Sequence, residues 1–233
     1  MSTAARLVSV GGVTFQRARN EAQREIRRTS ILDTAAAMLD EMPVADVTLN
    51  ELSRRVGLAK SNVLRYFESR EAVLLELLDE RLGTWLVELE AELTEAVDTA
   101  ASSDVRATQL ADVLSSSLAA RPVLCDLFGA QGGVLEHNVS VDVVVRHKRG
   151  SLAHLDSLAG LLRQHVPELG DRSRRLGLIA LVMAGAVSSY VPPPPAVTAA
   201  LEQAPELAFF RFELHQSLQI VLTAALLGFL PRD

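Results

Sequence analysis

The chain has 233 residues, of which 48% are apolar, and its formal net charge at pH 7 is −6. This composition excludes bulk disorder, because the apolar share is large enough to bury a sizeable core. The single cysteine, Cys125, excludes an intrachain disulfide, and its apolar surroundings favour a buried side chain over a redox sensor. Alanine and leucine dominate and β-branched alternation is weak, so we predict an all-α fold.

The charge is distributed unevenly along the chain. Residues 1–70 contain 11 Lys and Arg against 8 Asp and Glu, a net charge of +3, whereas residues 71–233 contain 12 against 21, a net charge of −9. A positive surface on the first part is therefore compatible with binding a polyanion, although the chain as a whole is acidic.

The N-terminal residues show no clear helical period, and we predict a flexible arm over residues 1–19. A helix is predicted over residues 20–41. Arg24, Arg27 and Arg28 cluster where the arm leads into this helix. They are interpreted either as the solvated start of a helix or as an arm that contacts phosphates or the minor groove, and both interpretations stay open.

A short helix with a glycine stop follows. Thr48 and Glu51 have the spacing of a capping box, in which the Thr hydroxyl accepts from an orphan N–H and the Glu reaches back. Gly57 ends the helix, because glycine adopts positive φ without a Cβ clash. The apolar residues recur at spacings of three and four on one face. They are Leu49, Leu52 and Val56.

A second short helix is predicted from about Lys60, eight residues long, with Val63 and Phe67 facing the core. The remaining side chains suit phosphates and base edges. They are Lys60, Ser61, Asn62, Leu64, Arg65 and Tyr66. Each residue alone also fits a helical hairpin with solvated charges. The joint pattern, closed by a further N-cap at Ser69, indicates a helix-turn-helix that binds DNA.

These motifs resemble the tetracycline-repressor (TetR) family of bacterial transcription regulators over about residues 24–78. The first helix ends in ILDTAAAMLDEM, and Val47-Thr48-Leu49 has the hydrophobic–Thr–hydrophobic pattern of the second helix. The turn and recognition helix, GLAKSNVLRYF, resemble the family's GVSKGTLYHYF, and SREAV resembles SKEAL. The resemblance implies a three-helix head over residues 20–70 and a helical regulatory and dimerisation domain over residues 71–233.

The resemblance also implies roles for individual residues. Thr48 and Tyr66 would contact phosphate, and Arg70 takes the place of the usual phosphate-binding Lys. The front of the recognition helix, near base edges, would be formed by Lys60, Ser61 and Asn62. Three positions depart from the family pattern and put the operator sequence in doubt, namely Ala59 for Ser, Leu64 for Tyr and Arg65 for His. Leu64 remains able to meet a thymine methyl group.

Helical patterns continue through the rest of the chain. A long helix from Ser69 to about Ala100 would extend roughly 45 Å and couple the head to the remainder. GAQGG, residues 129–133, is interpreted as a loop, and Pro192–Pro195 as a stiff extended link. The other predicted helices cover 104–119, a short segment after Pro122, 141–165, 171–190 with Asp171 as a cap, and 205–230.

The last two long helices, about 171–190 and 205–230, are unusually apolar. One side of the first consists of small residues, among them Gly177, Ala184 and Gly185, and the second has a broad apolar stripe that includes Phe210. This is more apolar surface than one small helical domain easily hides. In TetR-like proteins these helices pair with their copies, so we predict a homodimer, which also fits a palindromic DNA site.

No catalytic, metal or cofactor motif is recognised. The histidines lack metal-binding spacing, and neither a P-loop nor a nucleophile elbow occurs. By resemblance, a small-molecule effector would bind among helices of residues 84–190. Trp85, Phe128 and His137 are the candidate pocket residues, with Phe209 and Phe210 as further aromatic candidates, although aromatic residues in apolar helices are usually core.

The leading hypothesis is a homodimeric repressor that a small-molecule effector releases from a palindromic operator. No secretion leader or sufficiently long apolar helix is recognised, so a cytoplasmic protein without membrane contact is expected. The alternatives are an activator or ligand-independent regulator of the same fold and, from another class, a helical carrier of lipids or small molecules, or an enzyme, with a vestigial head.

Overall fold

A computed structural model describes residues 10–231, and it confirms the all-α prediction because no strand occurs among them. The N-terminal elements are α1 (Val10–Glu41), a 3₁₀ turn (Val44–Asp46), α2 (Leu49–Val56), α3 (Lys60–Val63) and α4 (Arg70–Ala96). The middle elements are α5 (Ser103–Ala119), α6 (Pro122–Ala130), a π-helical turn (Gln131–Leu135) and α7 (Val141–His165). The C-terminal elements are a 3₁₀ turn (Pro167–Leu169), α8 (Arg172–Ser188), α9 (Pro195–Gln203), a 3₁₀ helix (Pro205–Phe210) and α10 (Leu214–Phe229).

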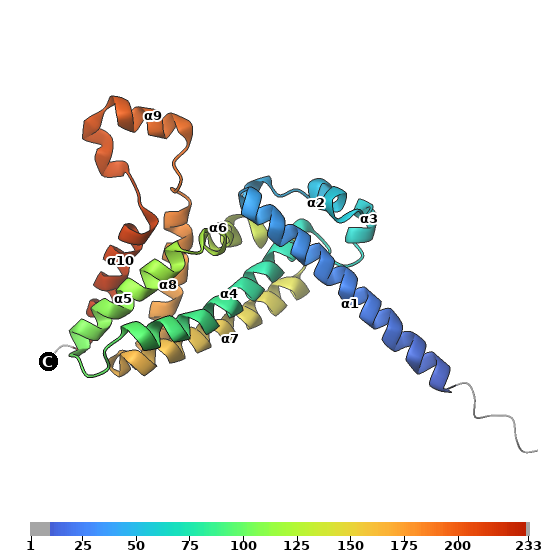
Figure 1. The fold of residues 1–233 in the computed structure, drawn as a ribbon, viewed down its shortest axis with the longest axis horizontal. Coiled ribbons are helices and arrows are strands. Elements are labelled where there is room, and N and C mark those ends of the chain that lie inside the picture. The colour runs from blue at the N-terminus through green and yellow to red at the C-terminus, as the bar shows by residue number, and fades with distance from the viewer. Residues whose placement is uncertain (1–9, 232–233) are drawn as a thin grey trace, which may run out of the picture.

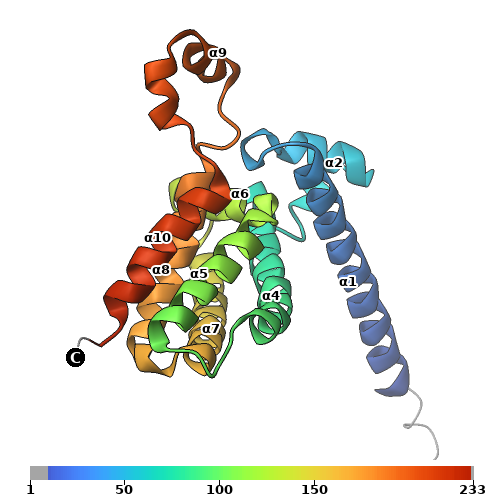
Figure 2. The same ribbon diagram turned by 60° about the vertical axis from the view of Figure 1, so that its left-hand side comes forward.

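The helices form a head and a body joined by α4. Helices α1, α2 and α3 lie together at one end of the molecule, and the N-terminal half of α1 extends away from them (Figure 1). Helix α4 leaves this head and packs along α7, while α10 packs against α5 and α8 on the other side of the body (Figure 2). Helix α9 and the following 3₁₀ helix project from the end of the body where α8 finishes (Figure 1).

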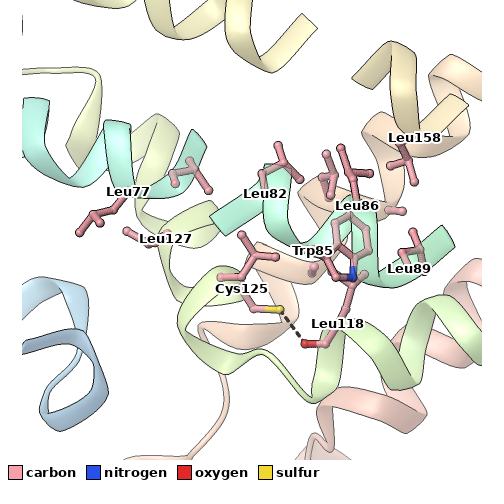
Figure 3. Packing of buried hydrophobic residues seen from close by; sticks show 14 of the residues in the cluster. Leu77, Leu82, Trp85, Leu86, Leu89, Leu118, Cys125, Leu127 and Leu158 are labelled. Atoms are coloured by element: carbon pink, nitrogen blue, oxygen red, sulfur yellow. Dashed lines mark hydrogen bonds between the residues drawn. The ribbon is translucent and has the colours of Figure 1, made fainter. Parts of the chain in front are cut away.

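The core of the body forms where leucines of α4, α5, α6 and α7 meet (Figure 3). Trp85 lies among them with 1% of its surface exposed, and its Nε1 donates to Ser117 Oγ at 2.9 Å. Cys125 is buried, and its Sγ donates to the Leu118 carbonyl oxygen at 3.3 Å. Burial raises the pKa of the Cys125 thiol to about 12, so the thiol stays protonated at neutral pH. The sequence-based interpretation of Cys125 as a buried residue is confirmed.

The small residues of α8 serve packing within the subunit. Gly185 faces Gly129 of α6 so closely that a Cβ on Gly185 would lie 2.6 Å from the Gly129 nitrogen. A Cβ on Gly177 would lie 3.1 Å from a methyl carbon of Leu158 in α7. Ala184 is fully buried between these contacts. The small-residue side of α8 is therefore used inside the subunit and is not free for a dimer contact.

Several predicted boundaries were wrong. Helix α1 begins at Val10, so residues 10–19 are helical where a flexible arm was predicted, and residues 1–9 lie outside the described residues. GAQGG is helical, because α6 continues into the π-helical turn, which the buried Leu135 anchors to the core. Helix α4 ends at Ala96, where an end at about Ala100 was predicted. Asp171 directly precedes α8, but its side chain does not form the predicted capping hydrogen bond.

The last predicted helix is broken in two. Residues Pro205–Phe210 form a 3₁₀ helix without a buried residue, and α10 begins only at Leu214. A helix gains most of its stability from packing an apolar face, which this segment lacks. Within residues 10–231, no single helix is long and apolar enough to cross a membrane. The segment from Ser103 to Leu135 meets that test only as two helices bent by 86°.

Candidate nucleic-acid interface

Helix α2 and its turn form the framework of the head. Thr48 Oγ1 accepts from the Glu51 backbone N–H at 3.2 Å, as the capping pattern predicts. The Glu51 carboxylate accepts from Arg54 at 2.6 Å and from Arg55 at 2.8 Å, where the capping box predicted a bond back to Thr48. These hydrogen bonds lower the pKa of Glu51 to about 2, and the bond from Arg54 has the largest effect. Gly57 closes the helix at φ 70°, which glycine adopts without strain.

Helix α3 presents the predicted recognition surface. Val63 and Phe67 are buried, as predicted, and they fix which side of the element faces out. The α-helix covers only Lys60–Val63; the chain then tightens through a bond from the Tyr66 N–H to the Val63 carbonyl oxygen at 2.9 Å. The predicted eight-residue helix is therefore one α-helical turn followed by a 3₁₀-type turn. The exposed side chains are Lys60, Ser61, Asn62, Leu64 and Arg65, with Tyr66 half-buried.

Helix α1 adds positive charge beside α3. Arg24 and Arg27 are exposed, and together with Arg65 and Tyr66 they line one surface hollow of about 520 Å³. Three guanidinium groups and one phenol from elements about 40 residues apart in sequence therefore meet at one place. All three guanidinium groups are donors without any acceptor capacity, a chemistry that suits phosphate oxygens.

Arg28 points inward and does not belong to this surface. Its guanidinium forms an ion pair with Glu76 of α4 and lies 4.4 Å from the centre of the Phe67 ring. Only 26% of the side-chain surface of each ion-pair partner is exposed. Arg28 thus fastens α1 to α4 and to Phe67 after α3, and the predicted DNA contact of this residue is not supported by its position.

Arg70 is also engaged within the subunit. Its guanidinium donates to the carbonyl oxygens of Val47 and Ala45, the latter at 3.4 Å, and pairs with Glu71 at 2.9 Å. These bonds hold the segment that leads into α2. The family pattern implied that Arg70 contacts phosphate. In the structure, Arg70 instead positions the segment that precedes α2.

Two hydrogen bonds between head and body were missed by the sequence reasoning. The Val44 N–H donates to Asp126 Oδ2 of α6 at 2.8 Å, and the Ser140 N–H donates to the Glu68 carboxylate. The partners lie 82 and 72 residues apart, so no local pattern identifies them. Both bonds join segments that flank α2 and α3 to the part of the body that leads into α7.

The body contains a cavity of about 250 Å³ between α4, α7 and α8. Phe128 lines it, as the sequence suggested, whereas Trp85 belongs to the core and His137 is exposed outside the cavity wall. His147 also lines the cavity, and burial lowers the pKa of this imidazole. Among the described residues, no group of three or more His, Cys, Asp or Glu side chains is placed to hold a metal ion.

Two family models together match most of the chain. Residues 31–77 match the model described as bacterial regulatory proteins, tetR family. Residues 79–233 match the model described as tetracyclin repressor-like, C-terminal domain. The chain belongs to the tetracycline-repressor family. The resemblance recognised in the head therefore extends through the body, where no sequence motif identified it.

Individual relatives agree with this family membership. The HTH-type transcriptional regulator EthR of Mycobacterium tuberculosis is 42% identical over 53 residues, which make up 23% of this chain and 24% of EthR. The matched part thus spans about a quarter of that regulator. FadR of Thermus thermophilus, a TetR-family repressor solved with lauroyl-CoA, covers 88% of this chain and 96% of its own, with a TM-score of 0.55 and 19% identity. A possible TetR-family regulator from Streptomyces coelicolor has a TM-score of 0.55 at 17% identity and covers 86% of this chain and 97% of its own.

Proposed function

We propose that this TetR-family protein is a homodimeric, sequence-specific transcriptional repressor that a small molecule releases from a palindromic operator. The observation that carries the proposal is the outward surface of α3 joined to the exposed arginines of α1. The family models and the EthR match support it. We propose no enzymatic activity, because the matched family model describes bacterial regulatory proteins.

In the proposed complex, the outer face of α3 enters the major groove. Lys60, Asn62 and Arg65 read base edges, because their donors and the Asn amide suit guanine and adenine. Ser61 and Leu64 lie on the same exposed face and contact the backbone and a thymine methyl group. The surrounding phosphates are held by Arg24, Arg27, Thr48 and Tyr66. Arg28 and Arg70 keep this surface in shape from within.

The dimer contact is assigned to the outward ridges of α8 and α10. Val182 of α8 has 59% of its surface exposed and Ile220 of α10 has 64%, and Leu178 and Leu227 are also exposed. Large apolar side chains on two neighbouring helices form the kind of surface that a partner subunit covers. Two heads related by a two-fold axis would reach half-sites about 34 Å apart or a multiple of this distance.

Release by an effector is assigned to the cavity between α4, α7 and α8. Helix α4 both lines this cavity and carries the head, so a ligand there can move the recognition surface. The FadR structure with lauroyl-CoA shows that a repressor of this fold holds a small molecule. The ligand must bind the released state more tightly by about 1–3 kcal/mol, which is a typical coupling energy. A ligand-independent regulator or an activator would use the same head.

Selection of bound duplexes from a random DNA pool tests the proposal. We expect recovery of an inverted repeat, bound by the dimer with an affinity that falls steeply as salt increases. A matched pair of variants, Arg65→Ala and Arg174→Ala, separates the recognition surface from general positive charge. Arg174 is exposed at the far end of the body and pairs with Asp156. Failure to bind any duplex at low salt would instead support the carrier alternative.

A further inference from the structure

The segment between α8 and α10 exposes a group of aromatic side chains. We call residues 189–213, which include α9 and the following 3₁₀ helix, the α9 segment; it projects from the body where α8 finishes (Figure 1). Phe209 and Phe210 have 89% and 60% of their surface exposed, and their rings meet edge to face with centroids 5.8 Å apart. Tyr190 and Phe212 are also exposed and lie against each other at the root of the segment, with ring centroids 5.0 Å apart. Clustered aromatic side chains of this kind are typical of a surface that another protein covers.

The charge of the α9 segment indicates what kind of partner fits it. Residues 189–213 contain Glu202, Glu206 and Glu213 against the single cation Arg211, a net charge of −2, and all four side chains are exposed. DNA phosphates repel such a surface, so a nucleic acid is not its partner. A fitting partner is apolar, with basic residues at its edge.

The opposite end of α8 carries a surface with these properties. A hollow of about 540 Å³ lies there, with an apolar floor formed by Leu155 of α7, Leu178 of α8 and Phe229 of α10. Its edge is formed by Asp171, Arg172, Arg174 and Arg175.

One of the edge arginines is available to a partner. Arg172 donates to the Phe229 carbonyl oxygen at 2.7 Å, and Arg174 pairs with Asp156. Arg175 is exposed, and it forms no ion pair within the part of the chain that the structure describes. The hollow therefore offers apolar surface next to an unpaired cation, whereas the α9 segment offers aromatic rings next to unpaired carboxylates.

The exposed ridge of α8 connects the hollow to the α9 segment. It passes through Arg175, Leu178, Val182 and Ser189, which are exposed and recur at spacings of three, four and seven on one helix face. Val182 lies midway, since Arg175 and Ser189 are each seven residues away, or about 10 Å along the helix. A two-fold axis beside Val182 that pairs two antiparallel copies of α8 places the start of each helix against the end of the other. A parallel pairing would bring the arginines of both copies together, which is unfavourable.

We propose that, in the dimer, the α9 segment of each subunit covers the hollow at the start of α8 in the second copy. Phe209 and Phe210 pack against the apolar floor, and the glutamates lie beside Arg175. The contact is isologous, so it occurs twice in each dimer and extends the ridges of α8 and α10 into one interface. This inference deepens the proposed function and rests on its homodimer.

The position of this contact has a consequence for the heads. It lies away from the two-fold axis, at both ends of α8, so it resists rotation of one subunit against the other. The α9 segment thereby helps to set the separation at which the two recognition surfaces meet the DNA.

Cross-linking of the full chain with a short bis-maleimide tests the arrangement. The double variant Asp171→Cys/Ala208→Cys should form covalent dimers, because the edge of the hollow lies beside the α9 segment of the second copy. Asp171→Cys alone should not, because antiparallel pairing separates its two copies by about 30 Å along α8. The native Cys125 does not react, because burial raises the pKa of its thiol to about 12.

The matched control combines Asp171→Cys with Val87→Cys, an exposed position on α4, and should give no covalent dimer. Covalent dimers from Asp171→Cys alone, or none from the double variant Asp171→Cys/Ala208→Cys, overturn the proposal.

Sedimentation velocity over a dilution series measures what the contact contributes. Phe209→Ser/Phe210→Ser should raise the dissociation constant of the dimer at least tenfold, and folding of the subunit is preserved because both side chains are exposed. Val87→Ser/Val141→Ser removes exposed apolar side chains of α4 and α7 and should change the constant less than twofold. A native dimer with the same dissociation constant as the Phe209→Ser/Phe210→Ser variant rejects the α9 contact alone. A native chain that stays monomeric at every concentration rejects the homodimer of the proposed function as well.

Discussion

The close contact between α6 and α8 allows us to predict how a substitution at Gly185 changes the stability of the protein. In Gly185→Ala, the new Cβ would lie 2.6 Å from the Gly129 nitrogen and 2.7 Å from the Phe128 carbonyl carbon. Both are backbone atoms, so no side chain can turn away and the two helices must separate. Overpacking of this kind costs about 3 kcal/mol at the upper end of its range. The higher helix propensity of alanine returns about 1 kcal/mol, which leaves a net loss of about 2 kcal/mol.

Gly160→Ala provides the matched control. Gly160 lies inside α7, and a Cβ there meets nothing within 4 Å. This variant should gain about 1 kcal/mol from helix propensity alone. The two variants should therefore differ by about 3 kcal/mol, or by roughly 6–12 °C in Tm for a chain of this size. Thermal unfolding at one fixed protein concentration measures the difference; equal melting temperatures would show that α6 and α8 do not approach as closely as described.

Three further predictions concern the head and the histidines. Arg65→Ala should weaken operator binding by about 1–3 kcal/mol in a fluorescence-anisotropy titration, whereas Arg174→Ala should leave it unchanged, and equal losses would remove the α3 assignment. Arg28→Ala should lower the free energy of unfolding by about 1–2 kcal/mol in urea, because it leaves the half-buried Glu76 unpaired; an unaltered midpoint would contradict that role. Burial lowers the pKa of His165, so the unfolded state binds more protons and this residue reduces stability as the pH falls through 6.5. His165→Leu should lose less stability than the native chain between pH 7.5 and 5.5 in parallel unfolding curves, and identical pH dependences would argue against it.

The parts of the fold that follow local rules were predictable. Helix α7 has the predicted bounds of residues 141–165, since the Ser140 hydroxyl caps its start and Pro167 follows its end. The burial of Val63 and Phe67 followed from their spacing of four, and this orients the outward face of α3. The capping of α4 by Ser69 was likewise predictable, and its Oγ accepts from the Ala72 N–H at 3.1 Å.

The mistaken roles of individual polar residues share one physical cause, because distant partners decide what a polar group does. The sequence alone predicts that Arg28 and Arg70 are exposed cations. In the structure, Arg28 pairs with Glu76 and Arg70 donates to the Val47 carbonyl oxygen. The wall of the cavity between α4, α7 and α8 includes Asp79 of α4 and His147 of α7. No spacing in the sequence indicates that these two residues lie on the same cavity. The DNA contacts assigned to α3 remain predictions.

Helix α4 spans 27 residues without interruption, from Arg70 at the head to Ala96 at the other end of the helix, in the body. At 1.5 Å per residue it acts as a stiff lever about 40 Å long. Tilting it by about five degrees at its far end carries the head through about 3.5 Å, close to the rise of one base-pair step. In the proposed homodimer, a tilt of this size would therefore be enough to put the two heads out of step with the turn of a double helix.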